Sequence, residues 1–262
     1  MPVDVCKLCL LTKDLRDSHM LPSAVWRLLN EPGHKLHHPI LMTEKLAMTS
    51  SRQIHDYVLC GDCEQLLNKN GEHYTIGQMR GKRGFPLLQR LRDAPPLASV
   101  GTVSSYNGAA IGIDTEKLSY FALSVVWRAG AYEWKNLYSD KPTYSIDLGL
   151  FLEPIRQFLL GTAPFPPNIA VNVQVASDLQ SQRSAYTPSW AAGARCPVVG
   201  FLVCGIHFAV AMGNPLPPEY LSTCCRNSPN RVIFEKDISG QSTRAFNRLY
   251  ATTRVVGKLR NR

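Results

Sequence analysis

The sequence lacks the long apolar segments that cross membranes. No uncharged apolar run reaches the roughly 18 residues that a membrane-spanning helix needs. The longest, Pro197 to Met212, is shorter than this and is interrupted by two glycines and a histidine. The opening residues also lack a charged stretch followed by an apolar one, so we expect no signal peptide. These absences predict a cytoplasmic protein with no membrane partner.

Sequence signatures of two enzyme classes are also missing. The segment 77–84 (GQMRGKRG) contains a Gly-x-x-x-Gly-Lys string, but it is too short for a phosphate-binding P-loop and continues with arginine where serine or threonine is needed. No Gly-x-Ser-x-Gly elbow occurs, which argues against a serine hydrolase. Charged residues make up 19% of the chain and hydrophobic residues 45%, a balance typical of a globular protein rather than a disordered one.

Basic charge is present in excess, with a formal net charge of +9. From Arg226 to the end, nine basic residues face two acidic ones, a net charge of +7. An earlier cluster contains no acidic residue: Arg80, Lys82, Arg83, Arg90 and Arg92. Such a field favours polyanions, so we expect a nucleic-acid partner, with Arg80, Lys82 and Arg83 contacting phosphates. The alternative is that both clusters are ordinary solvated surface.

The pattern of apolar and turn residues predicts an α+β protein. Ala94-Pro95-Pro96 marks a boundary between an N-terminal module, residues 1–95, and a mixed, strand-rich region of unknown role, residues 96–262. Helices are expected over 22–30, 44–50, 60–69 with Gly71 as a stop, 148–160 with Pro154 in the first turn, and 245–258. Strands are expected over 169–175 and over two segments of 197–212 that meet near Gly205, whereas 120–127 fits a buried helix or a strand.

The strongest motif is a pair of Cys-x-x-Cys elements, Cys6 with Cys9 and Cys60 with Cys63. Zinc prefers four soft ligands in a tetrahedron, and two such knuckles supply two thiolates each. The 50 residues between the pairs form a long insertion, which is tolerable because the entropy of loop closure grows slowly with length. We therefore predict a structural Zn²⁺ site. A redox pair fits less well, since two pairs are present and neither lies in a thioredoxin-like βαβ pattern.

These cysteines and their neighbours resemble a known family. Cys6-x-x-Cys9, the segment 18–22 (SHMLP) and Cys60-x-x-Cys63 followed by Glu64 resemble the zinc-containing HNH endonuclease module, a ββα treble-clef fold. The resemblance covers roughly residues 1–75. The whole chain also looks like uncharacterised bacterial proteins that join such a module to a C-terminal part with a Trp-Arg element, here Trp127-Arg128.

The resemblance implies roles for three catalytic residues. His19 matches the general base that activates water, while Ser18 stands where the family has a metal-binding aspartate. His55 lies five residues before Cys60, where the family has an asparagine, and Glu64 stands where a last histidine or asparagine would be. A carboxylate is a good ligand for Mg²⁺ or Mn²⁺, so Glu64 is expected to serve as a cation ligand, together with Asp56. His55 is expected either to be a further ligand or to orient a catalytic partner.

Simpler roles compete with these assignments. His19 beside a zinc knuckle is also placed to donate to a backbone carbonyl, and Glu64 near a helix start is favoured by the helix dipole alone. Three functions follow: a metal-dependent HNH-like endonuclease acting on DNA, a non-catalytic nucleic-acid-binding module, or a protein-interaction module in which zinc is purely structural. Cleavage supported by Mg²⁺ or Mn²⁺ separates the first from the second, and salt-dependent binding separates both from the third.

Overall fold

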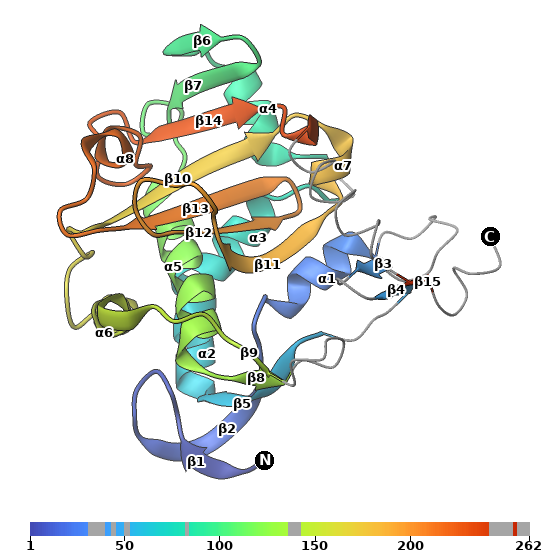
Figure 1. The fold of residues 1–262 in the computed structure, drawn as a ribbon, viewed down its shortest axis with the longest axis vertical. Coiled ribbons are helices and arrows are strands. Elements are labelled where there is room, and N and C mark those ends of the chain that lie inside the picture. Colours follow the sequence, from blue (N-terminus) through green and yellow to red (C-terminus); the bar gives the residue numbers. More distant parts are fainter. Residues whose placement is uncertain are drawn as a thin grey trace.

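A seven-stranded sheet, several smaller sheets and one long helix make up the described part of the chain (Figure 1). The computed structural model describes residues 1–30, 53–81, 84–135 and 143–240, together with the backbone of three short strands, β3 (Ile40–Met42), β4 (Leu46–Thr49) and β15 (Arg254–Val255). The architecture is α+β, as predicted, with N-terminal strands and a four-cysteine cluster followed by a strand-rich region.

The N-terminal part contains a small three-stranded sheet in the order β1-β2-β5. Its strands are β1 (Val3–Val5), β2 (Thr12–His19) and β5 (His55–Cys60). The helices of this part are α1 (Ser23–Leu29), α2 (Gly61–Leu67), the π-helical η1 (Asn68–Glu72), α3 (His73–Gln78) and α4 (Pro86–Arg92).

The second part is built on a seven-stranded sheet with the order β11-β12-β13-β10-β14-β7-β6. Its strands are β6 (Ala98–Val100), β7 (Val103–Asn107), β10 (Ile169–Ala176), β11 (Ala185–Trp190), β12 (Val198–Val203), β13 (Ile206–Met212) and β14 (Val232–Lys236). The remaining elements are α5 (Thr115–Ala131), β8 (Trp134–Lys135), β9 (Thr143–Tyr144), the 3-10 turn η2 (Gly149–Phe151), α6 (Leu152–Leu160), α7 (Leu179–Gln182) and α8 (Pro218–Ser222).

Helix α5 packs against the seven-stranded sheet and against helices of the N-terminal part. Its N-terminus is capped by Asp114, whose carboxylate accepts a hydrogen bond from the amide of Lys117 at 3.0 Å. On the sheet side, the ring of Phe121 contacts the rings of Phe201 and Phe208. Elsewhere the helix contacts η1, α3 and α6. Nearly all of α5 is buried, so this apolar segment is a core helix rather than a strand.

The hydrophobic core continues across residue 95. One cluster of buried residues includes Leu67 of α2 and Leu118 of α5, as well as residues of the large sheet. The division of the chain into 1–95 and 96–262 stays a prediction, but α2 and α5 share one apolar interior. Burying such side chains together contributes roughly 1.5–3 kcal/mol for each large one.

Most of the expected elements are confirmed. Helix α1 falls within 22–30, α6 starts at Leu152 with Pro154 in its first turn, and β10 covers 169–175. Strands β12 and β13 form a hairpin whose turn, Cys204-Gly205, has positive φ at both positions, 43° and 90°. This backbone twist suits a two-residue hairpin turn and explains why glycine lies there.

Two of the expected helices are wrong in the described residues. Residues 46–49 of the helix expected over 44–50 form strand β4, which pairs with β3. Residues 254–255 of the helix expected over 245–258 form strand β15, parallel to β4. Strand pairing has overridden the local helical pattern at both positions. The rest of these segments lies outside the described residues.

Gly71 does not stop the helix that begins at Gly61. The chain continues through η1 and α3 to Gln78. A Cβ at residue 71 would lie 2.8 Å from the backbone nitrogen of Phe121, too close for any side chain. Glycine therefore allows η1 to pack closely against the backbone of α5. The helix continues past Gly71 through a π-helical turn.

Among the residues that the structure describes, no helix combines the length and apolar character that crossing a membrane requires.

We expect His207 on β13 to make the stability of the fold decrease at acidic pH. Burial and, secondarily, the charge of Lys236 lower the pKa of its imidazole from 6.5 to about 4. A Cβ at residue 200 would lie 3.3 Å from Nε2 of this ring, so the glycine leaves space for the imidazole. The unfolded chain takes up this proton more readily between the two pKa values, so stability is complete above pH 6.5 and falls as the pH drops towards 4.

We expect the free energy of unfolding to fall by about 2 kcal/mol between roughly pH 7.5 and pH 5 because of this one group. Urea titrations of wild type and His207→Gln at both pH values measure the contribution as a difference. The exposed His73, replaced by glutamine, is the control and should leave the pH dependence as in wild type. An identical pH dependence in His207→Gln and wild type would contradict the assignment.

Candidate metal centre and histidine site

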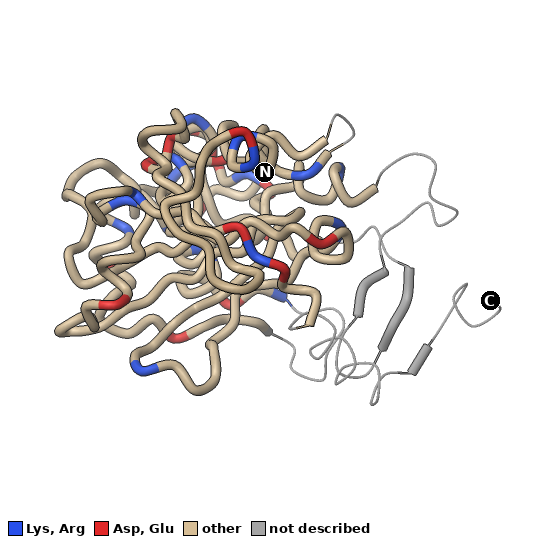
Figure 2. Tube along the Cα trace, turned by 90° about the horizontal axis from the view of Figure 1, so that it is seen from above, with Lys and Arg blue, Asp and Glu red and all other residues tan. Residues whose placement is uncertain are grey.

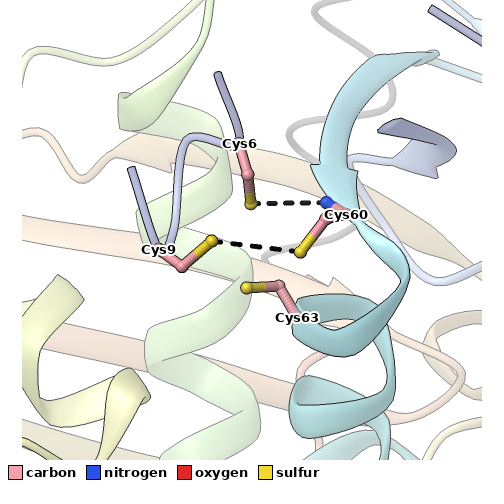
Figure 3. A group of neighbouring side chains, drawn as sticks. All are labelled: Cys6, Cys9, Cys60 and Cys63. Carbon is pink, nitrogen blue, oxygen red and sulfur yellow. Dashed lines mark hydrogen bonds between the residues drawn. The ribbon is translucent and has the colours of Figure 1, made fainter. Parts of the chain in front are cut away.

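The turn between β1 and β2 carries the first two cysteines. The amide of Leu10 donates to the carbonyl of Cys6 at 2.8 Å, and the amide of Cys6 donates to the carbonyl of Leu11 at 3.0 Å. Leu10 has a φ of 61°, the left-handed conformation that closes the turn. The sulfurs of Cys6 and Cys9 consequently lie on the inner side of the turn (Figure 3).

The second pair comes from the start of α2. Cys60 ends β5 and immediately precedes the helix, and Cys63 lies in its first turn. The amide of Cys60 donates to Sγ of Cys6 at 3.3 Å, while the amide of Lys7 donates to the carbonyl of Val58 at 3.1 Å. These bonds hold the β1–β2 turn against the end of β5, which brings the two cysteine pairs together.

The four cysteine sulfurs converge as a tetrahedral metal site requires. All four Sγ atoms lie within 4.8 Å of one another, and those of Cys9 and Cys60 are 3.9 Å apart. Zinc–sulfur bonds of about 2.3 Å in a tetrahedron place sulfurs about 3.8 Å apart. Within the described residues this is the one group of three or more His, Cys, Asp or Glu side chains that fits a metal ion. The cluster could hold a metal such as zinc.

Each thiol changes the pKa of its neighbours. A hydrogen bond from the Cys63 thiol, with help from backbone amides, lowers the pKa of Cys6 to about 4 despite burial. The same bond raises the pKa of Cys63. One thiolate is therefore favoured at the expense of its neighbours. A divalent cation would stabilise all four thiolates together, which fits the chemistry of this donor set.

The cysteines lie on a ββα framework. Strand β2 is antiparallel to β5, and α2 follows β5 directly. In this order of turn, hairpin and helix, two cysteines come from the turn and two from the start of the helix. Residues 20–54 separate the two hairpin strands in the sequence, which accounts for the long spacing between the cysteine pairs.

The hairpin brings His19 and His55 side by side. The two residues are cross-strand partners at the end of β2 and the start of β5. Their rings stack with centroids 5.5 Å apart and planes inclined by 26°. Nδ1 of His55 lies 2.6 Å from Oδ1 of Asp17. Burial lowers the pKa of His19, with His55 and Arg128 adding to the effect and Asp17 and Glu64 opposing it, so His19 is neutral at neutral pH.

Glu64 lies on α2 and interacts with His19 and Arg128. One of its oxygens, Oε2, is 3.8 Å from Nη2 of Arg128. The other, Oε1, is buried without a hydrogen-bond partner. The charge of this carboxylate raises the pKa of His19 and so opposes the effect of burial. His19, His55 and Glu64 do not form a second preformed metal cluster within the described residues.

Arg128 anchors this region from α5. Its side chain is only 2% exposed, and Nη2 lies 2.5 Å from Oε1 of Glu72. A guanidinium this deeply buried needs a carboxylate partner, and Glu72 on η1 supplies it. Nε and Nη1 of Arg128 are buried without hydrogen-bond partners. Two carboxylates, those of Glu64 and Glu72, face the single positive charge of Arg128, so the group as a whole carries one excess negative charge.

Ser18 and Asp56 are committed elsewhere. The Ser18 hydroxyl accepts a hydrogen bond from the amide of Leu59 at 3.0 Å and is buried within the hairpin. Asp56 accepts from the hydroxyl of Tyr132 at 3.0 Å and pairs with Lys135 at 3.2 Å. These bonds, together with one from a backbone amide, outweigh burial and lower the Asp56 pKa.

The predicted phosphate contacts are described only in part. Arg80 is half-buried, its amide donates to the carbonyl of Cys204 at 3.0 Å, and its Nε is buried without a partner. Lys82 and Arg83 lie outside the described residues. Acidic and basic residues are interspersed over the described part of the chain (Figure 2). Arg92, for example, pairs with Glu235 at 2.9 Å.

Comparison with known proteins adds no relative: no family profile, curated protein or solved structure matches this chain. The case for a site at the four-cysteine cluster and the histidine pair therefore comes from the geometry of this chain alone.

Sequence reasoning missed Asp17 and left Arg128 without a role. Asp17 lies two residues before His19, a spacing that places both on one face of a strand. A strand assigned to residues 12–19 would have revealed it. Arg128 follows an apolar run, and a charge in such a segment signals a buried ion pair. Its partners, Glu64 and Glu72, are distant in sequence and are not identifiable without the fold.

Proposed function

We propose that this chain is a zinc-stabilised, metal-dependent endonuclease of the HNH type that hydrolyses DNA phosphodiester bonds. The observation that carries the proposal is the hairpin geometry: β2 and β5 place His19 against His55, next to the helix that bears Glu64. This is the arrangement that the sequence resemblance leads one to expect around a general base. The basic net charge of +9 supports a polyanionic substrate.

In this proposal His19 removes a proton from the attacking water. Its lowered pKa favours the neutral imidazole that a general base requires. Glu64 and His55 would hold Mg²⁺ or Mn²⁺, and the buried, unpartnered Oε1 of Glu64 fits a hard cation. Mg²⁺ commonly keeps several waters and takes only one or two protein ligands beside substrate phosphate. The bound cation would supply charge neutralisation at the scissile phosphate.

His19→Ala should lower the cleavage rate by about 100-fold or more, the usual contribution of a general base. The His73→Ala variant is the matched control, since His73 is exposed on α3. The wild-type rate should stay constant as the pH falls through 6.5 and decline only below it, because the His19 pKa lies below that ordinary value. Rates of plasmid nicking with Mn²⁺ measure both effects. Full activity in His19→Ala would exclude it as the base.

A non-catalytic nucleic-acid-binding module is the second candidate. It is favoured by the ion pair of Glu64 with Arg128 and by the buried hydroxyl of Ser18, where the resemblance has a metal-binding aspartate. In this case zinc and basic residues would serve binding alone. DNA binding that weakens steeply with salt, without cleavage in Mg²⁺ or Mn²⁺, would support it.

A further inference from the structure

The side chain of Asp17 makes a short contact with His55 that the pairing of the two strands does not itself require. Its Oδ1 lies 2.6 Å from Nδ1 of His55, across the hairpin. Backbone register places Asp17 opposite Tyr57, not opposite His55, so the contact is diagonal. Both side chains are about half exposed, 50% for Asp17 and 47% for His55. An ion pair this exposed adds little to stability, which leaves the short contact in need of another explanation.

The contact determines which nitrogen of His55 carries the proton. An ionised carboxylate only accepts hydrogen bonds, so Nδ1 of His55 must donate to Asp17. The neutral ring then has its lone pair on Nε2. His19 stacks against the same ring at a centroid distance of 5.5 Å, which also restrains its plane. The His55 ring is therefore held both at its Nδ1 edge and on one face.

We propose that Asp17 is a positioning residue that fixes His55 in the Nδ1–H tautomer and so presents Nε2 as a ligand for a divalent cation. The metal-ligand role of His55 rests on the proposed nuclease function. The tautomer of its ring does not depend on that function and can be measured without it. Histidines that bind metals commonly donate their other ring N–H to a carboxylate, and loss of that partner costs about 10- to 100-fold in metal affinity or activity. Asp17 and His55 have this relationship.

The first test is the ring tautomer. Long-range ¹H–¹⁵N spectra of ¹⁵N-histidine-labelled protein at about pH 8, where imidazoles are ordinarily neutral, distinguish the two protonated nitrogens. His55 is assigned by the signal that His55→Gln removes. Wild type should show His55 protonated at Nδ1, and Asp17→Ala should shift it towards Nε2. A wild-type ring protonated at Nε2, or a spectrum unchanged in Asp17→Ala, overturns the proposal.

The second test uses Mn²⁺ as the probe, in the zinc-loaded protein. Asp17→Ala should raise the Mn²⁺ concentration for half-maximal plasmid cleavage by about 10-fold or more. Asp17→Glu, which keeps a carboxylate, should need a Mn²⁺ concentration between those of wild type and Asp17→Ala. Asp14→Ala is the matched control, because it removes an exposed carboxylate three residues away on the same strand. Equal Mn²⁺ requirements in the Asp17 and Asp14 variants, with equal melting temperatures, overturn the metal-ligand role.

Failure of the nuclease function would be recognised separately. If wild type cleaves no nucleic acid, paramagnetic broadening by Mn²⁺ takes the place of cleavage as the readout. The His55 ring signals of wild type should then broaden at a Mn²⁺ concentration about 10-fold below that needed for Asp17→Ala. Equal broadening in the two proteins overturns the positioning role.

Discussion

Replacing Cys60 with serine should remove the bound metal and unfold the N-terminal region. Cys60 contributes a sulfur that lies 3.9 Å from that of Cys9 and is one of the four that converge. Structural zinc contributes about 10–16 kcal/mol of binding free energy to the folding of small modules, so losing one of four thiolates should destabilise this region by several kcal/mol. The shared core with α5 should transmit part of this loss to the second part.

Metal analysis and thermal unfolding measure this prediction. Purified wild type should contain about one zinc per chain, the stoichiometry of a single four-cysteine site. Cys60→Ser should contain far less zinc and melt at a lower temperature. Cys196→Ser is the control, since Cys196 lies outside the four-cysteine cluster and is partly exposed. Unchanged zinc content and melting temperature in Cys60→Ser would show that the four cysteines are not a metal site.

Replacing Arg128 with methionine should be nearly as damaging. The guanidinium is 2% exposed and is the described partner of Glu72 at 2.5 Å and of Glu64 at 3.8 Å. Its removal leaves the buried carboxylate of Glu72 uncompensated, which typically costs about 3–5 kcal/mol, and also removes the charge that faces Glu64. The change should also free Glu64 from its ion pair and so alter the environment of His19.

A second substitution separates charge from packing. Arg128→Met combined with Glu72→Gln removes the uncompensated carboxylate and should recover a large part of the lost stability in urea unfolding. Arg195→Met is the exposed control, because Arg195 pairs with Glu219 at 3.2 Å with 83% of its side chain exposed, and such pairs contribute about 0–1 kcal/mol. If Arg128→Met unfolded at the same urea concentration as Arg195→Met, the buried ion pair would have no structural role.

The cysteine site was predictable from sequence because its information is local. A Cys-x-x-Cys turn places two sulfurs on one side of a short segment whatever surrounds it. Strand β10 and the hairpin around Gly205 were predictable for a similar reason, since alternation and a turn residue act over a few positions. These are features in which local preference and tertiary packing agree.

The rest depends on contacts between distant segments. Gly71 is a helix stop by local rules, but the backbone of Phe121 lies so close that glycine is needed inside a continuing helix. Residues 46–49 form a strand through pairing with β3, which local propensity does not encode. Arg128 and Asp17 acquire meaning only from partners on other elements, namely Glu72 and His55.

Plasmid cleavage tests the central claim most directly. Zinc-loaded wild type and His19→Ala are incubated with supercoiled DNA in Mn²⁺, in Mg²⁺ and with divalent cation removed, and DNA binding is measured on the same samples. The account predicts nicking by wild type only when Mn²⁺ or Mg²⁺ is present, with at least a 100-fold lower rate in His19→Ala. Tight, salt-sensitive binding by both proteins with the DNA left intact would contradict the nuclease and identify a binding module instead.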